Sequence, residues 1–252
     1  SQDGSLAYLE DIAGQSTSLK LIKSGSNQGF ASASNLGAGL ARGKYLLFLN
    51  PDARFSQRGI YKLIEFYLLK GNTEKIGAVG PRMVNTDGTL QYNARSFPNL
   101  GRQFLESSFL YRIRRIPWLS SYFLLWWDHA SVREVDWLSG ACLFIAKDTF
   151  GEAGGFDPSY FMYSEDTDLC LQLARKGYHN YYYPFWEVIH ADSGIASRNR
   201  SLRMSQIWES RTIYFKKNFN WCYSKAASIL FGWGILNRTI LAFVLGQIPK
   251  AR

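Results

Sequence analysis

Carboxylates gather at two points of this chain where they could bind a cation or move a proton. The first point is Asn50-Pro51-Asp52, which directly follows an apolar run. A carboxylate at the carboxyl end of a buried strand projects into the ligand crevice of an α/β sheet, where it is able to ligate Mg2+ or Mn2+. Turn chemistry is the alternative, because Pro-Asp is common in turns and Asp52 could serve only as a cap.

The second point carries Glu165, Asp166 and Asp168 within one short acidic stretch. Acidic residues in the first turn of a helix complement the helix dipole, which accounts for any one of them. Three carboxylates so close together repel one another, and such packing is typical of a cation site or a proton-transfer site.

His190 and the segment around Gly29 are weaker candidates. A histidine beside one or two carboxylates suits Mn2+ better than Mg2+, although a lone histidine is more often structural. Asn27 precedes Gly29 and a helix that contains Asn35, and a helix N-terminus can receive an anion or simply be capped. The segment is not G-x-G-x-x-G, so no dinucleotide cofactor is predicted.

The elements that position these residues alternate in the first half of the chain. Strands are expected at Leu19–Ile22, Lys44–Leu49 and Ile76–Val79, and helices at Phe30–Arg42 and Ser56–Leu69. This alternation predicts an α/β sheet with parallel neighbours, which binds ligands at the carboxyl ends of its strands.

The second half is less regular. Asp87-Gly88 is a hairpin signal, and residues 97–133 are irregular, aromatic and basic. The remaining expected elements are a strand over Val135–Ile145 broken at Gly140, a helix over Glu165–Lys176, a strand over Tyr178–Tyr183 ended by Pro184, and a helix over Ser201–Lys217.

Composition narrows the class of protein. The chain has 252 residues, of which 46% are apolar and 19% charged, so a disordered protein is excluded. Its three cysteines have no C-x-x-C spacing, which excludes a zinc site of that type and favours a reducing compartment. The net charge of +9 suits a nucleic acid, a membrane or a phosphorylated small molecule.

The placement of the basic residues favours a membrane surface. Several of them, including Arg112 and Lys225, stand beside aromatic or aliphatic runs. Residues 226–246 are apolar but carry Asn237, Arg238 and Thr239 at their centre, so an interfacial or packed helix is expected rather than a clean membrane span.

Taken in order, these motifs resemble those of family-2 glycosyltransferases with the GT-A fold, and most closely the bacterial rhamnosyltransferase-like branch. The resemblance extends from residue 1 to about residue 220. It is carried by Asn27-Gln28-Gly29-Phe30 with Asn35, Leu49-Asn50-Pro51-Asp52, Gly80-Pro81-Arg82 with Asp87-Gly88, Asp136-Trp137-Leu138-Ser139-Gly140-Ala141, Gly154-Gly155-Phe156-Asp157, Phe161-Met162-Tyr163-Ser164-Glu165-Asp166-Thr167-Asp168-Leu169, and His190 with Gly194 and Ser197.

The resemblance implies a fold of this kind: a mixed, mainly parallel α/β sheet flanked by helices, with a glycosyltransferase domain over 1–220 and a helical appendage over 221–252. Residues 1–5 resemble the end of a family segment, so the family's first strand is expected to precede this sequence. The implied activity is inverting transfer of a sugar, with rhamnose suggested by the branch, from a nucleoside-diphosphate sugar to a hydroxyl of a lipid-linked or polysaccharide acceptor.

The resemblance also implies roles for individual residues. Asp166 matches the catalytic base, and Glu165 its neighbour in the acceptor site. Asp52 matches the last position of the metal-binding D-x-D motif, with Asn50 in place of the first Asp, and His190 matches a further ligand of Mn2+ or Mg2+. Asn27, Gly29 and Asn35 would line the nucleotide pocket. The implied sugar and acceptor side consists of Arg95, Trp137, Gly140, Ala141 and Asp168.

Two other classes remain open from the residues alone. A nucleotidyltransferase shares such a core and a metal, but it should carry a Gly-rich basic loop near its first strand. A non-catalytic scaffold or a basic nucleic-acid binder is the second class, although no nucleic-acid motif is present. With the glycosyltransferase interpretation, the expected location is cytoplasmic and peripheral on the inner face of the membrane.

Overall fold

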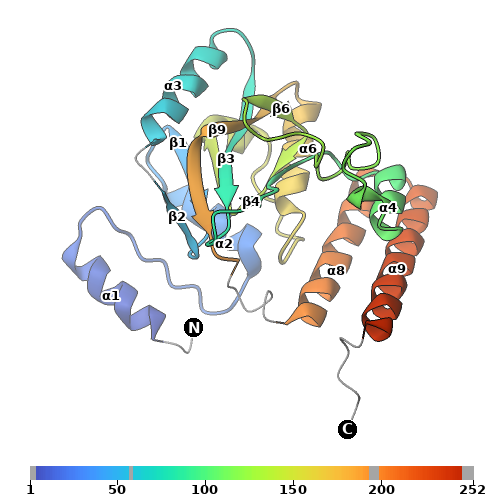
Figure 1. Cartoon of the computed structure of the whole chain (residues 1–252). Helices are drawn as coiled ribbons and strands as arrows, with labels where there is room; N and C mark the ends of the chain where they lie inside the picture. Colours follow the sequence, from blue (N-terminus) through green and yellow to red (C-terminus); the bar gives the residue numbers. More distant parts are fainter. Residues whose placement is uncertain (1–3, 57–58, 193–198, 246–252) are drawn as a thin grey trace.

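A mixed β-sheet forms the centre of the molecule. The computed structural model describes residues 4–56, 59–192 and 199–245, and within them seven strands have the order β1-β8-β3-β9-β2, with β4 beside β3 and β6 beside β9 (Figure 1). A small second sheet pairs β5 with β7. The strands are β1 (Tyr45–Leu49), β2 (Ala53–Phe55), β3 (Ile76–Val84), β4 (Leu90–Gln91), β5 (Ala94–Arg95), β6 (Arg133–Val135), β7 (Trp137–Leu138), β8 (Cys142–Ala146) and β9 (His179–His190).

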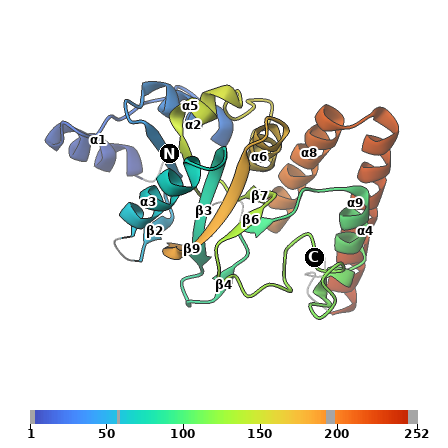
Figure 2. The ribbon, with the colours of Figure 1, turned by 90° about the horizontal axis from the view of Figure 1, so that it is seen from above.

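Helices pack on both faces of the sheet (Figure 2). On one face α3 (Ile60–Gly71) buries Leu63 and Tyr67, and on the other lie α2 (Gly29–Leu40), α5 (Lys147–Glu152) and α6 (Glu165–Arg175). Strand β8 shows why: Leu143 and Ile145 join one core cluster and Cys142 and Phe144 the other, as the two-residue period of a strand requires. The helix α1 (Ser5–Gln15) buries no side chain.

The sheet is mixed, as the sequence predicts, but the expectation that it is mainly parallel is wrong. Among the pairs formed by described residues, β3–β9 alone is parallel. Strands β1 and β3 do run in the same direction, yet β8 lies between them and is antiparallel to both. The strand–helix–strand pattern predicts direction correctly, but it carries no information on a later strand inserted between the two.

Two expected strand boundaries are also wrong. Residues 19–22 form no strand and pair with none of the described strands, because β1 at the sheet edge takes only β8 as its partner. Strand β9 continues through Pro184 to His190, because the pairing with β3 slips from Tyr183 to Glu187 and the proline stands in that irregularity, where no ladder N–H is needed.

The C-terminal helices form a separate layer beside the sheet. This layer contains α4 (Leu100–Ser107), the 3-10 turn η1 (Leu110–Arg112), α8 (Arg200–Asn218) and α9 (Trp221–Val244) (Figure 1). Within the described chain, α9 is the one helix long and apolar enough to cross a membrane by length and composition. Its central Asn237 donates from Nδ2 to the backbone oxygen of Ser107 at 3.0 Å, so this polar side chain serves to hold the end of α4.

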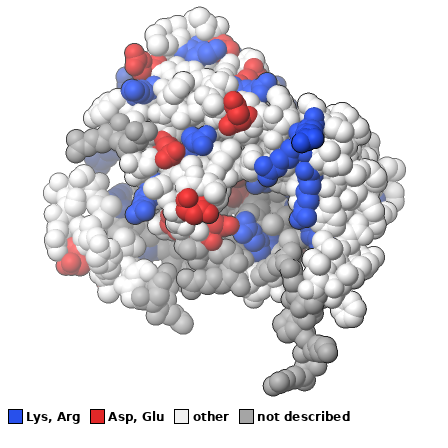
Figure 3. Space-filling model, in the orientation of Figure 1, with Lys and Arg blue, Asp and Glu red and all other residues white. Residues whose placement is uncertain are grey.

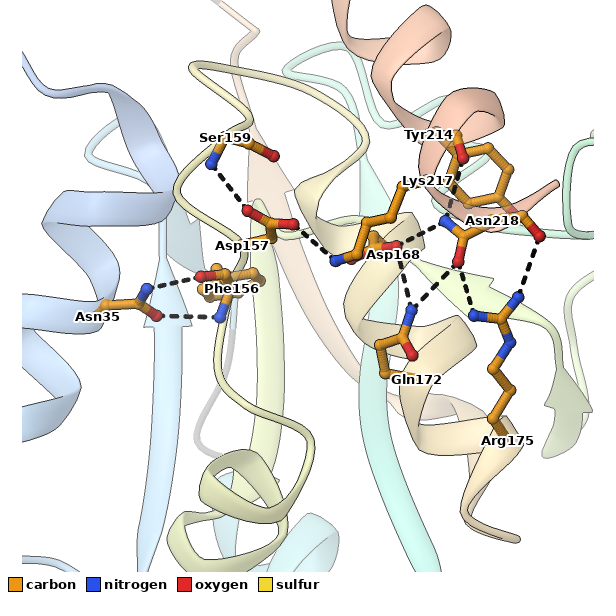
Figure 4. A network of polar contacts seen from close by, with 10 residues as sticks. All are labelled: Asn35, Phe156, Asp157, Ser159, Asp168, Gln172, Arg175, Tyr214, Lys217 and Asn218. Carbon is orange, nitrogen blue, oxygen red and sulfur yellow. Dashed lines mark hydrogen bonds and ion pairs between the residues drawn. The ribbon is translucent and has the colours of Figure 1, made fainter. Parts of the chain in front are cut away.

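A polar network attaches α8 to α6 (Figure 4). Lys217 donates from Nζ to Asp168 at 2.7 Å and to Asp157 at 2.6 Å, and Asn218 donates to the other oxygen of Asp168 at 2.8 Å. The side chain of Asp168 is 3% exposed, so its charge depends on these partners. Asp168 therefore supports the packing of the C-terminal layer against the sheet domain.

We expect Lys217→Met to lower the free energy of unfolding by about 1–3 kcal/mol, because Asp168 is left buried without its cation. Urea denaturation measures this loss. The matched control is Lys216→Met, which removes the same charge from an exposed neighbour with no ion pair among the described residues. Equal stability of the two variants would contradict the role assigned to the network.

Candidate active site

Asp166 lies at the start of α6 and is held by backbone N–H groups. Its Oδ2 accepts a hydrogen bond from the N–H of Gly140 at 2.9 Å, and its Oδ1 accepts one from the N–H of Thr167 at 2.7 Å. The Thr167 hydroxyl lies 3.3 Å from the same Oδ1. These bonds fix the carboxylate in one orientation toward the loop that precedes β8.

The backbone before α6 is strained. Tyr163 and Ser164 have φ angles of 70° and 65°, in the left-handed region that residues other than glycine adopt at a cost of about 1–2 kcal/mol each. The preceding carbonyl of Phe161 accepts the N–H of Phe30 at 2.9 Å, and a Cβ at Gly29 would lie 2.1 Å from that carbonyl oxygen. Gly29 therefore permits the close contact that supports this segment. Such strain is typical of functional sites.

Glu165 and Asp166 are buried side by side, so ionisation of either carboxyl group is unfavourable. Burial raises the pKa of the Asp166 carboxyl, against the opposing effect of its backbone hydrogen bonds. Burial, followed by the adjacent Asp166 charge, raises the pKa of Glu165 well above its usual range. Glu165 Oε2 has no hydrogen-bond partner, whereas both oxygens of Asp166 accept backbone N–H groups, so a single negative charge on the pair is stabilised better on Asp166.

Arg95 contacts Trp137, and its charge acts on Asp166. The Arg95 guanidinium lies 5.2 Å from the centroid of the Trp137 ring, and its positive charge acts to lower the pKa of Asp166, against the dominant effect of burial. The buried Trp137 indole donates to the backbone oxygen of Ser96 at 2.9 Å. The tryptophan is thus fixed and orients the arginine through a cation–π contact.

Asn50, Asp52 and His190 meet at the carboxyl ends of β1 and β9. Nε2 of His190 lies 3.2 Å from Oδ1 of Asp52 and 3.5 Å from Nδ2 of Asn50. Strand β2 makes this contact, because Ala53 pairs with His190 and the Asp52 backbone oxygen accepts the N–H of Ala191. The proximity of Asp52 and His190 follows from a short strand that the sequence did not reveal.

Gln91 orients the His190 ring at this position. Gln91 donates from Nε2 to Asn85 and to the His190 backbone, so its Oε1 accepts the hydrogen from Nδ1 of His190 at 2.9 Å. The other ring nitrogen, Nε2, then faces the Asp52 carboxylate. A proton on Nε2 would make this 3.2 Å contact an ion pair, and without that proton Nε2 and Oδ1 would both be available to a cation. Carboxylate and imidazole together suit Mn2+.

Few side chains of the protein could serve as metal ligands beside Asp52 and His190. No group of three or more His, Cys, Asp or Glu side chains that could hold a metal ion occurs in the described part of the chain. A cation there would need ligands from elsewhere, such as a diphosphate. Gln91, which orients His190, was missed by the sequence analysis, because its position in β4 follows from a hairpin and carries no motif of its own.

One backbone hydrogen bond joins the two centres. The N–H of Asn50 donates to the backbone oxygen of Ala141 at 2.9 Å, and the preceding residue, Gly140, holds Asp166. A Cβ at Gly140 would lie 3.3 Å from the Phe30 ring and 3.5 Å from Cβ of Asp166, so little space is available there. The Asn50–Asp52 segment and Asp166 therefore flank the same turn before β8.

Other sequence candidates lie apart from these contacts. Asn35 uses both ends of its amide on the backbone of Phe156, at 2.6 Å and 3.0 Å, and so holds the loop before α6 (Figure 4). Asn27 is exposed and accepts the N–H of Gly29 at 3.1 Å. Asp168 is occupied by Lys217, as described above. Gly194 and Ser197 lie outside the described residues.

A family model and two curated proteins match this chain. Residues 1–131 match the model described as Glycosyl transferase family 2. The chain is 31% identical over 207 residues to the N-acetylglucosaminyl-diphospho-decaprenol L-rhamnosyltransferase of Mycobacterium tuberculosis, which covers 78% of this chain and 66% of that protein. It is 28% identical over 174 residues to Rhamnosyltransferase WbbL of Escherichia coli, covering 66% of this chain and 62% of the relative. The chain thus spans a little under two thirds of the length of these relatives.

A solved structure shows the same fold. The mannosyltransferase PcManGT from Pyrobaculum calidifontis, in complex with GDP-Man and Mn2+, has a TM-score of 0.56 and 14% identity to this chain. The match covers 100% of this chain and 65% of that one. At this identity the likeness establishes the fold alone, and it confirms the GT-A architecture that the sequence resemblance predicts.

The raised pKa of Glu165 predicts how the stability of the fold depends on pH. At a pH below the ordinary carboxyl pKa, Glu165 is protonated in both the folded and the unfolded chain. Its ionisation then has no effect on the free energy of unfolding. As pH rises past that value the unfolded chain loses the proton first, so the raised folded pKa makes stability fall with pH. Glu165→Gln should therefore be more stable than the parent by about 1 kcal/mol or more at pH 7.5, with little such gain at pH 4.

Denaturant unfolding at the two pH values measures this difference. The control is Glu65→Gln, an exposed glutamate of α3 with no ion pair among the described residues. A Glu165→Gln gain that is the same at pH 4 and pH 7.5 would show that Glu165 is not held protonated.

Proposed function

Because the chain belongs to glycosyl transferase family 2, we propose that it transfers a sugar from a nucleoside-diphosphate sugar to an acceptor hydroxyl, with inversion at the anomeric carbon. The observation that carries this proposal is the turn before β8, where Gly140 holds Asp166 and Ala141 holds the Asn50–Asp52 segment. A base and a cation-binding carboxylate on opposite sides of one turn provide the two groups that such a reaction needs.

Asp166 is the proposed base. Acceptor hydroxyls are weak acids, so the attacking oxygen must lose its proton to a positioned group as it approaches the sugar. The N–H groups of Gly140 and Thr167 fix Asp166 and lower the cost of its ionisation, while Glu165 retains its proton. Arg95 then offers a positive charge beside the acceptor side of the crevice.

Asp52 and His190 are the proposed protein ligands of Mn2+ or Mg2+, with Asn50 beside them. A bound cation would neutralise charge on the departing nucleoside diphosphate. Gln91 keeps the Nε2 lone pair of His190 directed at this position. Asn27, Gly29 and Asn35 would contribute to the nucleotide side, Asn35 by holding the loop at Phe156.

The finer assignments are proposed from the relatives. Rhamnose is the proposed sugar, carried by thymidine diphosphate, and the acceptor is proposed to be lipid-linked, as the name of the mycobacterial relative states for that protein. We assign the chemistry to residues 1–220 and membrane contact to 221–252. The apolar helix α9 supports a peripheral position on the inner face of the membrane.

We expect Asp166→Asn to lower the turnover number by about 100- to 10,000-fold while leaving donor binding nearly unchanged. A thermal-shift screen of nucleoside diphosphates and their sugars with Mn2+ first identifies the donor. Release of the nucleoside diphosphate in the presence of acceptor then measures turnover. Asp148→Asn, an exposed aspartate in α5, is the matched control. Normal turnover of Asp166→Asn would disprove the assignment of the base.

Asp52→Ala should instead remove the part of donor binding that depends on the cation. In the parent we expect the thermal shift caused by the nucleoside diphosphate to be larger with Mn2+ than with chelator, because the bound ligand stabilises only the folded state. In Asp52→Ala the two shifts should coincide. Asp148→Ala is the control, and a persistent Mn2+ effect in Asp52→Ala would place the cation elsewhere.

A further inference from the structure

A pocket of about 410 Å³ opens between the end of α4 and the last turns of α9. Arg112 and Arg238 line it together with Phe109, and Leu241 and Leu245 of α9 complete an apolar side. None of these residues takes part in the proposed chemistry at Asp166 and Asp52. The lining combines positive charge with an apolar surface, which is the chemistry that recognises an anionic group carried on a hydrocarbon chain.

Phe109 is placed in this pocket at a conformational cost. Its φ of 63° is left-handed, in a turn after α4 where its N–H donates to the Glu106 oxygen at 3.3 Å. Glycine is the usual residue at such a position, and a larger side chain costs about 1–2 kcal/mol. The turn brings the Phe109 ring within 5.2 Å of the Arg112 guanidinium and 5.4 Å of the Arg238 guanidinium. The ring thereby holds two cations near each other.

The positive charge at this pocket is not balanced by nearby acids. Glu106 lies 3.7 Å from Arg238 and 3.5 Å from Arg211, so one carboxylate faces two guanidinium groups. Arg112 is exposed and forms no ion pair with any described residue. The pocket can therefore attract an anion, and two guanidinium groups suit the oxygens of a phosphate.

Helix α9 also presents an apolar stripe, on the side of the helix opposite Arg238. Five of its residues that share one side of the helix are each more than half exposed: Ile229, Leu236, Ile240, Phe243 and Val244. The surface over α9 is uncharged in the view of Figure 3, with basic side chains beside it. This combination of an apolar helix face and adjacent arginines is typical of a helix that lies in a membrane interface.

The packing of α9 favours this position over a membrane span. Asn237 and Arg238 contact the end of α4, and Phe231 packs against Trp208 of the charged helix α8. Crossing a bilayer in this arrangement would carry α4 and α8, with their arginines and glutamates, into the hydrocarbon. The stripe can instead enter the interface while the docked side of α9 stays on the protein.

We infer that the pocket at Phe109, Arg112 and Arg238 binds the phosphate headgroup of an anionic membrane phospholipid, with the apolar stripe of α9 seated in the same bilayer. The inference rests on the proposed membrane contact and names its lipid class and its binding residues. The headgroup phosphate lies between the two guanidinium groups, and the acyl chains run past Leu241 and Leu245.

Vesicle co-sedimentation of the full chain tests this site, with phosphatidylcholine alone and with phosphatidylcholine containing phosphatidylglycerol, at one fixed salt concentration. Arg112→Gln should lower partitioning onto the anionic vesicles by about fivefold and leave the neutral vesicles unaffected. The matched control is Lys62→Gln, which removes the same charge from α3, on the far side of the molecule from α9 (Figure 1). An Arg112→Gln loss no larger than the control's would overturn the pocket assignment.

Two further variants separate the pocket from the stripe. Phe109→Gly suits the left-handed turn and removes the ring, so it should weaken anionic binding without the loss of stability that a damaged turn would cause. The pair Ile240→Ser with Phe243→Ser should weaken binding to both kinds of vesicle. If this pair acts as expected but Arg112→Gln does not, the pocket proposal fails and membrane contact stands.

Two outcomes decide the remaining alternatives. If soluble glycerol phosphate binds the full chain in the absence of lipid, and Arg112→Gln abolishes that binding, the pocket serves a soluble phosphate and the lipid assignment is overturned. If the parent binds neither vesicle, membrane contact and the pocket both fail. The proposed sugar transfer is judged separately by Asp166→Asn.

Discussion

The burial of two adjacent carboxyl groups at the start of α6 is the constraint on which the candidate site depends. Ionising both Glu165 and Asp166 away from water is costly, and the protein stabilises the two carboxylates to different extents. Backbone N–H groups of Gly140 and Thr167 serve Asp166, whereas Glu165 Oε2 receives no partner. The charge therefore has one favoured location. The result of this asymmetry is a carboxylate at Asp166 that is held in one orientation and is favoured over Glu165 as the site of the charge.

The same turn explains how residues far apart in the chain meet. Strands β1, β3 and β9 run in one direction, so their carboxyl ends reach a common edge, and β8 begins there because it is antiparallel. Asn50 bonds to Ala141 at that edge, while β2 carries Asp52 alongside His190. The mixed sheet therefore still brings these segments to one edge. Antiparallel insertion of β8 is what places Gly140 between the Asn50–Asp52 segment and Asp166.

Local patterns in the sequence predict much of this arrangement, and contacts between distant segments account for what they miss. The apolar run ending at Leu49 predicts β1, and the acidic first turn predicts α6, because both signals are contained within one element. The amide of Asn35 binds the backbone of Phe156, 121 positions away, a contact that no motif in the sequence predicts. Gln91 orients His190 across 99 positions. Single-sequence periodicity contains no information about such pairs.

The polar residues at the centre of α9 are a second case in which a contact between distant segments explains what the sequence pattern does not. Asn237 and Arg238 interrupt an apolar run, and the sequence alone indicates only that a clean membrane span is disfavoured. The structure supplies the cause, because these side chains satisfy backbone oxygens at the C-terminal end of α4, where a helix has carbonyls without partners and a partial negative charge. Once those polar groups are occupied, the rest of the helix circumference is free to be apolar. Exposure of that apolar stripe is therefore compatible with a folded, docked helix, and its most economical explanation is an apolar surface that it contacts outside the chain.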